Sequence, residues 1–163
     1  MKNEICKLSE LIQGIQVAMM TTVDQHGYLR SRPMMTQKHE FDGTLWFFTR
    51  SDAAKAGELS QDQRVNLSYA DDDEKHYVSI SGKANITRDA GKIKEFWNPM
   101  YKAWFPDGIE DPTLALLKVE VDRAEYWDTH RSAMVYLIGF AKGMVTGKPY
   151  HPGENKKIDL AAS

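Results

Sequence analysis

The stretch HGYLRSRPMMTQKHEFDGTLWFFTRSDAAK, residues 26–55, decides the fold that the sequence predicts. It contains two candidate strands, 29–36 and 45–49, each bounded by turn residues. Gln-His-Gly precedes the first strand and Phe-Asp-Gly separates the two, and glycine beside a polar residue is typical of turns. We therefore expect these two strands to form a hairpin.

Basic residues alternate along the first of these strands. Side chains two residues apart in a strand share a face, so Arg30 and Arg32 lie on one face and Ser31 on the other. A short helix should open at residues 50–52, with Lys55 in its first turn. A hydroxyl, an amine and a helix N-terminus then converge, which is typical of a phosphate site. The other interpretation is an ordinary hairpin with solvated arginines.

Three short motifs carry a resemblance to a known family. Ser-Arg-Pro-Met at 31–34, Trp-Phe-Phe-Thr at 46–49 and the lysine six residues later resemble the FMN-binding split-barrel family related to pyridoxamine 5'-phosphate oxidase, most closely its general stress protein 26-like branch. In that family an arginine of the first strand and a lysine of the next helix hold the flavin phosphate. The resemblance therefore implies that Arg32 and Lys55 bind the phosphate of FMN.

The same resemblance implies where the rest of the flavin lies. The isoalloxazine ring would lie against the backbone of residues 33–36 and beside the strand end at 48–49, and a serine would help to hold the phosphate. The implied site residues, besides the arginine and the lysine, are Ser31, Pro33, Met34, Met35, Thr36, Phe48, Thr49 and Ser51.

Trp127 lies where the family commonly places a tryptophan near the flavin, at the end of the last barrel strand. A core or interface position is an equally good interpretation, because indole rings are favoured at both places. The family's sites lie between two subunits, so the resemblance implies a two-fold homodimer with flavin sites at the subunit interface. Trp127 would then reach the ring from the partner chain.

Length and composition predict one domain over residues 1–163, with a surface tail from about residue 148. The net charge of -2 offers no basic field for nucleic acid. Cys6 is the only cysteine, which argues against a disulfide framework and fits a reducing cytoplasm. We expect neither a signal peptide nor a membrane helix, because charged residues interrupt every apolar stretch.

Apolar periodicity predicts further strands and helices along the chain. The strand at 17–23 should pair with 29–36 and continue as a meander through 45–49. The further expected strands are 65–70, 77–86 with a bulge at Gly82, 114–121 and 124–127, the last two joined by a bulge or turn at Asp122 and Arg123. These strands predict a mainly β fold, a β-barrel with α additions. The resemblance implies an antiparallel Greek-key split barrel.

The helical pattern starts at the N-terminus. The expected helices are one ending near Gly14, one at 53–59 capped by Ser51 or Asp52, one at 89–97 capped by Thr87, and one at 134–145. The tail at 150–163 should lie on the surface or fray. The aromatic segment 100–112 should plug the barrel end as a small second core, and lining a ligand site is its alternative interpretation.

Several kinds of site are not expected. The five histidines show no metal-ligand spacing, and the acidic run at 71–74 lacks the pattern of a calcium loop. Glycine-rich phosphate loops of the Rossmann and Walker types are absent from the sequence. We therefore expect no metal, and no nicotinamide dinucleotide bound in a Rossmann fold.

The chain also departs from the family's oxidases. They have an arginine where this chain has Ala54 and a lysine where it has Gln37, and nothing after Trp127 matches their C-terminal Arg-x-His element. Each lost charge-assisted contact is typically worth about 1.5 to 3 kcal/mol. We therefore do not expect vitamin B6 oxidation, and FAD stays open as an alternative to FMN.

A flavin brings its own redox chemistry, so the sequence identifies no catalytic side chain. The first hypothesis is a flavin-dependent oxidoreductase that reduces a small, unidentified substrate, with NAD(P)H as the candidate electron donor. The second is a stress protein that binds or sequesters flavin without turnover. The third is a barrel that binds haem or another cofactor in place of flavin.

Overall fold

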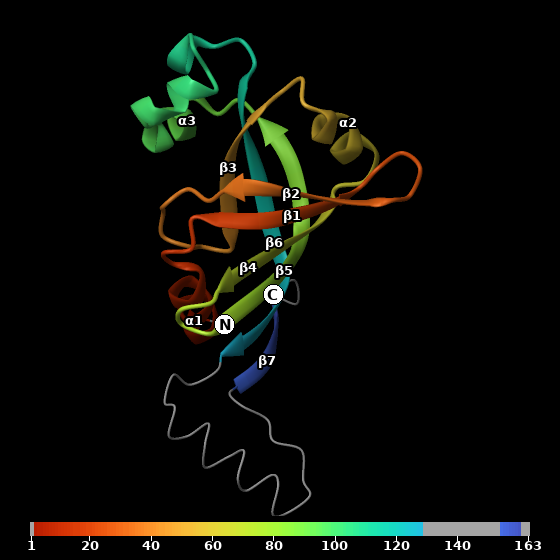
Figure 1. Ribbon diagram of the computed structural model, residues 1–163, viewed down its shortest axis with the longest axis vertical. Helices are drawn as coiled ribbons and strands as arrows, with labels where there is room; N and C mark the ends of the chain where they lie inside the picture. The colour runs from red at the N-terminus through yellow and green to blue at the C-terminus, as the bar shows by residue number, and fades with distance from the viewer. Residues whose placement is uncertain (1, 129–153, 161–163) are drawn as a thin grey trace, which may run out of the picture.

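The computed structural model describes residues 2–128 and 154–160, and groups of strands in it are separated by short helices (Figure 1). The strands are β1 (Val17–Val23), β2 (Leu29–Met35), β3 (Thr44–Arg50), β4 (Arg64–Asp71), β5 (His76–Thr87), β6 (Leu114–Asp128) and β7 (Glu154–Asp159). The helices are α1 (Lys2–Ile12), α2 (Ala54–Gln61) and α3 (Ala90–Phe96), with 3-10 turns η1 (Pro99–Ala103) and η2 (Gly108–Glu110).

The strands form one antiparallel sheet in the order β2-β1-β4-β5-β6-β3, and β7 pairs with the far end of β6. The sheet curls until its two edge strands meet at a single bridge between Thr36 and Phe47. Strand β3 pairs with β6 and not with its sequence neighbour β4, which is a Greek-key connection. The predicted antiparallel split barrel with α additions is therefore confirmed.

The predicted hairpin between 29–36 and 45–49 is wrong. Strand β2 forms its ladder with β1 across the turn at Gly27, as expected, but it meets β3 only at the Thr36–Phe47 bridge. The reason is the connection at residues 37–43, which lets β3 cross over to β6. There β3 gains a full antiparallel ladder, from Thr44 opposite Glu120 to Arg50 opposite Leu114.

Two hydrophobic cores lie on opposite faces of the β3–β6 pair. The larger core fills the barrel interior, where α1 and α2 contribute Leu8 and Leu59. The smaller core lies outside β3 and β6 and is covered by α3 and the η1–η2 segment; its buried members are Trp46, Ile93, Phe96, Phe105, Leu114 and Leu116. The aromatic segment after residue 100 thus contributes Phe105 to a second core, but it covers the outside of β3 and β6 and does not plug the barrel end as predicted.

The predicted bulge at Gly82 is confirmed. The β5–β6 register pairs Ser81 with Arg123 but Gly82 with Val121, which leaves Asp122 as the extra residue on β6. A Cβ atom at Gly82 would lie 2.1 Å from the carbonyl oxygen of Glu120, so only glycine allows this close approach. The bulge bends the sheet where the barrel must curve.

Two predicted helix caps are wrong. The residue before α2 is Ala53, whose side chain cannot cap, because Asp52 is turned to Arg50 in a two-bond ion pair at 3.0 Å. Strand β5 extends through Thr87, so Asp89 caps α3 instead by accepting a hydrogen bond from the Lys92 N–H. Both helices begin one residue later than the sequence pattern indicates.

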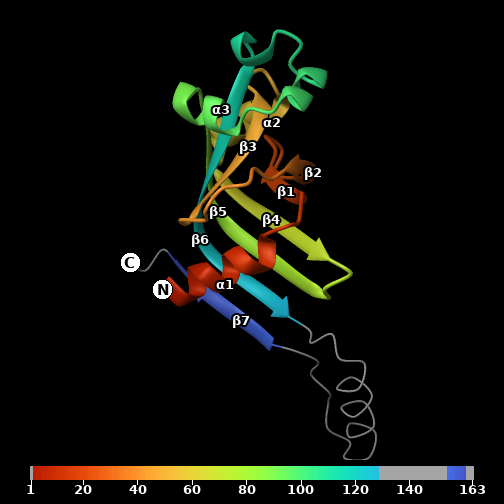
Figure 2. The ribbon, with the colours of Figure 1, turned by 90° about the vertical axis from the view of Figure 1, so that its left-hand side faces the viewer.

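The C-terminal half of the sheet differs from prediction in two ways. Strand β6 runs unbroken from Leu114 to Asp128 because Asp122 is accommodated as a bulge. Residues of the predicted fraying tail form β7, whose Ile158 is buried in the barrel core. Helix α1 lies beside this end of the sheet (Figure 2), tied to it by an ion pair of 2.8 Å between Lys7 and Asp128.

The helix expected at 134–145 lies outside the described residues. Within residues 2–128 and 154–160, none of the helices has the length and apolar character that crossing a membrane requires.

Candidate functional site

A cavity of about 440 Å³ opens where the ends of β2 and β3 meet the start of α2 and η1. This volume lies in the range of about 300 to 1,000 Å³ that is typical of ligand pockets. The residues that line it are Val17, Pro33, Met34, Met35, Phe48, Thr49, Arg50, Ala53, Lys55, Tyr101, Trp104 and Phe105. Six of the residues that the sequence analysis assigned to the site therefore line one cavity.

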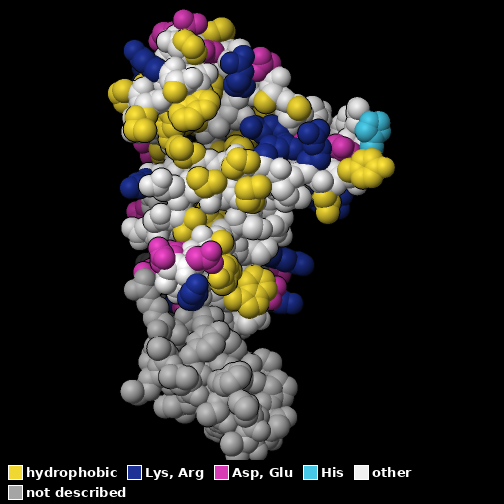
Figure 3. All heavy atoms as spheres, viewed as in Figure 1, with side chains coloured by type: hydrophobic (Ala, Val, Ile, Leu, Met, Phe, Trp, Pro, Cys, Tyr) yellow, Lys and Arg dark blue, Asp and Glu magenta, His cyan; other side chains and the backbone are white. Residues whose placement is uncertain are grey.

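Helix α2 packs beside β1 and β5, and two of its charged side chains reach toward β2. Lys55 and Glu58 are three residues apart, so they share one side of the helix. On β2, Arg30 and Arg32 share a face as the alternation predicts, because both guanidinium groups lie within 4 Å of the Glu58 carboxylate. Figure 3 shows Lys and Arg side chains gathered where α2 lies beside the β1–β2 hairpin.

Glu58 makes the shortest contacts in this group. Its Oε2 atom accepts a hydrogen bond of 2.7 Å from Arg32 Nη2 and one of 2.6 Å from the Thr22 hydroxyl. Arg32 Nη2 also donates to Thr22 Oγ1 at 3.0 Å, while Arg30 is the more distant partner at 3.8 Å. Burial raises the pKa of Glu58, but the hydrogen bonds from Thr22 and Arg32 lower it more, so the carboxyl group is ionised at neutral pH.

Lys55 lies between this ionic cluster and the cavity. Its Nζ atom is 3.7 Å from the Met34 sulfur, and it also lines the cavity wall. Burial and the nearby Arg32 charge lower the pKa of Lys55, and only Glu58 acts in the other direction. An anion bound here would restore the ordinary pKa of this amine by supplying a negative charge.

Arg32 has an unused donor. Its Nη1 atom is buried and has no hydrogen-bond partner among the residues that the structure describes. A buried charged donor without an acceptor is costly, so this nitrogen has the capacity to donate one further hydrogen bond. With three cations against the one carboxylate of Glu58, the cluster has a surplus of positive charge, which fits a phosphate group.

Aromatic side chains form the opposite wall of the cavity. The Phe48 and Tyr101 rings lie 4.7 Å apart, and Tyr101 is 6.5 Å from Trp104. The Tyr101 hydroxyl donates a 2.9 Å hydrogen bond to Gln37 Oε1, which ties η1 to the end of β2. The aromatic segment therefore does both things that the sequence left open, because it packs as a core and also lines the cavity.

The structure does not bring every predicted site residue to this cavity, and Arg32 contacts Lys55's neighbour Glu58 without itself lining the cavity. The Ser31 hydroxyl lies 2.7 Å from that of Thr21, on the face of β2 opposite Arg32. Ser51 is exposed in the turn before α2. Thr36 lies past the cavity end of β2, where its hydroxyl is 3.5 Å from the Tyr69 hydroxyl.

Trp127 is remote from the cavity within one chain. It pairs with Tyr77 at the β7 end of β6, whereas Ala115 pairs with Thr49 at the cavity end. Twelve residues of extended strand span about 40 Å. The indole is 41% exposed, which excludes a core position in the single chain and leaves the interface interpretation of Trp127 open.

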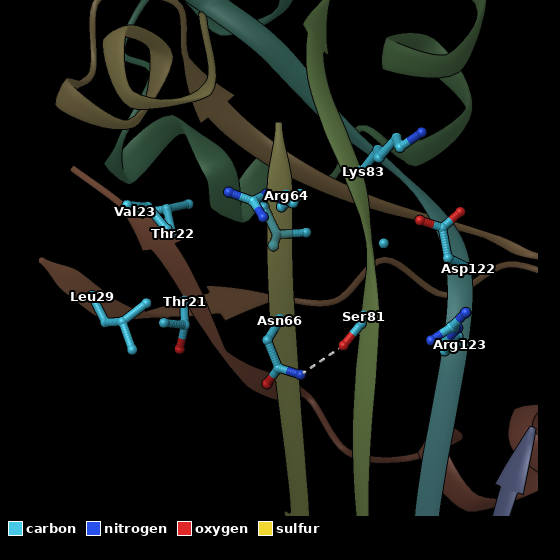
Figure 4. A pocket seen from close by; sticks show the side chains of 12 residues that line it. Thr21, Thr22, Val23, Leu29, Arg64, Asn66, Ser81, Lys83, Asp122 and Arg123 are labelled. Carbon is cyan, nitrogen blue, oxygen red and sulfur yellow. Dashed lines mark hydrogen bonds between the residues drawn. The ribbon is translucent and has the colours of Figure 1, made fainter. Parts of the chain in front are cut away.

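A second hollow of about 560 Å³ lies where β1 leaves β4 (Figure 4). Asn66 and Ser81 face one another there and share a 3.3 Å hydrogen bond. Its arginines already have acidic partners, Arg64 with Asp62 and Arg123 with Asp159. Lys83 is a further cation in its lining, but the lining has no aromatic residue, unlike that of the first cavity.

The sequence analysis missed Glu58, Thr22 and Val17 as neighbours of the site. The spacing of Glu58 three residues after Lys55 is the signal that would have placed both near β2. Val17 lies near the site because the register of β1 and β2 pairs it with Met35. No group of three or more potential metal ligands occurs in residues 2–128 and 154–160.

Comparison with known sequences identifies a family and a relative. Residues 3–151 match the family model described as "Pyridoxamine 5'-phosphate oxidase like". Protein bli-3 of Neurospora crassa is 32% identical to this chain over 156 residues, which cover 90% of this chain and 75% of bli-3.

Solved structures share the architecture. The general stress FMN/FAD binding protein of Xanthomonas citri is 30% identical, with a TM-score of 0.68 over 81% of this chain and 93% of that one. A protein of Clostridium acetobutylicum related to general stress protein 26 has a TM-score of 0.71 over 99% of this chain and 98% of its own. At 17% identity, the second likeness shows the fold alone.

Proposed function

The chain belongs to the pyridoxamine 5'-phosphate oxidase-like family, and on that premise we propose that it is a flavin-binding protein with FMN as its cofactor. The observation that carries the proposal is the unpaired, buried Nη1 atom of Arg32 in one charged cluster with Lys55, and Lys55 itself lines the aromatic cavity. A phosphate and a planar ring are the two chemical features that such a site suits.

In this proposal Arg32 and Lys55 bind the phosphate, and the ring lies against residues 33–35 and Phe48. Bound flavin would supply the redox chemistry through its ring. The chain's own residues would fix the phosphate, orient the ring and limit the access of water. The similar Xanthomonas citri protein is an FMN/FAD binding protein, so FAD is the alternative ligand.

We propose further that the protein is a homodimer. The outer face of β1 and β2 is apolar and exposed, with Val17 opposite Met35 and Met19 opposite Pro33. Val17 and Met35 also line the cavity, so a second copy on this face would complete the cavity wall. A two-fold axis near the middle of the sheet would bring Trp127 of each chain toward the other chain's cavity.

The proposed activity is that of a flavin-dependent oxidoreductase in the cytoplasm, which reduces a small-molecule substrate with NAD(P)H as the candidate donor. A second candidate is a protein that holds flavin without turnover. The cavity wall favours neither strongly, since Lys55 and Tyr101 are its main groups able to exchange a proton. An NAD(P)H bleaching assay distinguishes the two candidates. The oxidoreductase should let NAD(P)H bleach bound flavin faster than free flavin, and the protein without turnover should not.

The first test is a visible absorption spectrum of the purified protein before and after adding FMN and gel filtration. The proposal expects flavin bands that co-elute with a dimer-sized protein peak. A protein that loses all flavin on the column after saturation would contradict it. Substituting Met19→Asp should shift the peak to monomer size, because it buries a charge in the proposed interface.

A further inference from the structure

The most constrained ionic contact near the cavity involves Glu58, which has no direct part in the proposed flavin site. The Glu58 side chain is 8% exposed, and the same oxygen of it accepts from both Thr22 and Arg32. Thr22 itself is 1% exposed. Three groups from β1, β2 and α2 therefore form a closed, buried triangle of hydrogen bonds.

This triangle determines how the Arg32 guanidinium lies. The guanidinium group is planar and its donors are arranged as a rigid fork, so fixing one nitrogen orients the others. Nη2 is held by Glu58 Oε2 at 2.7 Å and Thr22 Oγ1 at 3.0 Å. Nη1 is the nitrogen left without a partner among the described residues.

We propose that Glu58 is a positioning residue, which holds Nη2 of Arg32 so that Nη1 is presented to the phosphate monoester of the ligand. This inference rests on the proposed function. Thr22 supports it by holding the carboxylate in place at 2.6 Å. Glu58 acts only through Arg32 and need not touch the ligand.

The charge balance of the cluster selects the ligand class. Arg30, Arg32 and Lys55 carry three positive charges, and Glu58 neutralises one of them. Asp24 also interacts with the charge of Arg30, and the cluster still keeps a surplus of positive charge, which attracts the phosphate monoester with its charge of about -2. Riboflavin has the same ring and no phosphate, so it separates effects on the phosphate site from effects on the ring site.

The experiment compares the dissociation constants of FMN and riboflavin for the full-length chain and its variants. Glu58→Gln keeps the side-chain shape, and it should weaken FMN about tenfold while leaving riboflavin unchanged. Thr22→Val should give a smaller loss that is again confined to FMN. Glu120→Gln, an exposed carboxylate paired with Lys118, is the matched control and should change neither constant.

A double-mutant cycle tests whether Glu58 acts through Arg32. In an Arg32→Ala background, Glu58→Gln should no longer weaken FMN. Tighter FMN binding by Glu58→Gln alone would overturn the inference, because it would mean that the carboxylate only repels the phosphate. Equal losses for FMN and riboflavin would overturn it too, as a general structural role. If the unmodified chain binds neither ligand, the proposed function fails and this inference falls with it.

Discussion

The Lys55 amine lies 3.7 Å from the sulfur of Met34, although the two residues come from α2 and β2. This contact places a charged group beside an apolar one at the wall of the cavity. Burial, with Arg32 nearby, holds the pKa of Lys55 below its usual value. A protonated lysine in such a place costs folding free energy, which is characteristic of a residue kept for binding.

Replacing Lys55 by methionine should therefore have opposite effects on stability and binding. Because the pKa is lowered in the folded state, the cost of the charge is present below that pKa and disappears above the unfolded value of 10.5. At neutral pH, Lys55→Met should raise the free energy of unfolding of the flavin-free protein by about 0.5 kcal/mol after screening. FMN should bind about tenfold more weakly. Urea unfolding and flavin titration measure the two effects, and a less stable variant would contradict the argument.

Replacing Arg32 by alanine should weaken FMN by about 1 to 3 kcal/mol, because a charge-assisted contact to the phosphate is lost. The control is Arg64→Ala, which removes an arginine that is paired with Asp62 away from the cavity. Fluorescence titration gives both affinities. An unchanged affinity in Arg32→Ala would refute the assignment of the phosphate site.

The emission of bound FMN tests the two-subunit arrangement. Trp104 lines the cavity within one chain, whereas Trp127 would have to come from the partner. If the partner's indole lies beside the ring and quenches it, Trp127→Phe should increase the emission yield of bound FMN. Trp104→Phe serves as the comparison within one chain. Equal yields for Trp127→Phe and the unmodified protein would place this indole elsewhere.

Substitution by alanine should have opposite effects on the free energy of unfolding at Gly82 and at Gly57. Gly82→Ala places a Cβ against the Glu120 carbonyl oxygen, and it should lower the free energy of unfolding by about 2 kcal/mol or more. In α2, a Cβ on Gly57 meets no atom within 4 Å, so Gly57→Ala should raise stability by about 0.5 to 1 kcal/mol. Denaturant unfolding of both variants checks the sign, and a neutral Gly82→Ala would mean that the sheet relaxes at the bulge.

Glu58 should make stability depend on pH in the acid range. Its pKa in the folded state is below the ordinary 4.5, so its contribution is complete above that value and is lost as the pH falls through the folded-state pKa. The stability difference between the unmodified protein and Glu58→Gln should thus shrink from about pH 7 to about pH 3. Urea unfolding across this range measures it. A constant difference would show that the carboxylate charge contributes nothing.

The sequence predicts local structure here better than it predicts strand partners. Strand β1 has its predicted bounds, Val17–Val23, because its β-branched and apolar pattern and the glycine turn that follows it agree. The partner of β3 could not be predicted, since nothing in the sequence of β3 distinguishes a position beside β2 from one beside β6. Strand β7 was missed because Ile158 is the only apolar residue in ENKKID, and its pairing with β6 supplies what the pattern lacks.

The candidate site shows the same division. The alternation that puts Arg30 and Arg32 on one face is local, and the structure confirms it. The position of α2 near β2 depends on tertiary packing, so the contact between Glu58 and Arg32 was not foreseen. The sequence left two positions open for Tyr101, in a core or at a ligand cavity. No sequence pattern could decide between them, because the ring packs against Phe48 and also lines the cavity.

The bulge in β6 also determines which aromatic side chain lies on the outside of the barrel. Up to Val121 the odd-numbered side chains of β6 fill the interior, whereas from Ala124 onward the even-numbered ones do. The additional residue Asp122 at the bulge therefore moves the inward-facing positions of β6 from odd to even residue numbers. A regular strand that kept Asp122 without the bulge would send Trp127 inward and Tyr126 outward. Deleting Asp122 would instead remove the bulge and leave both side chains on their present faces, so the bulge, and not the Asp122 carboxylate, determines where the indole lies.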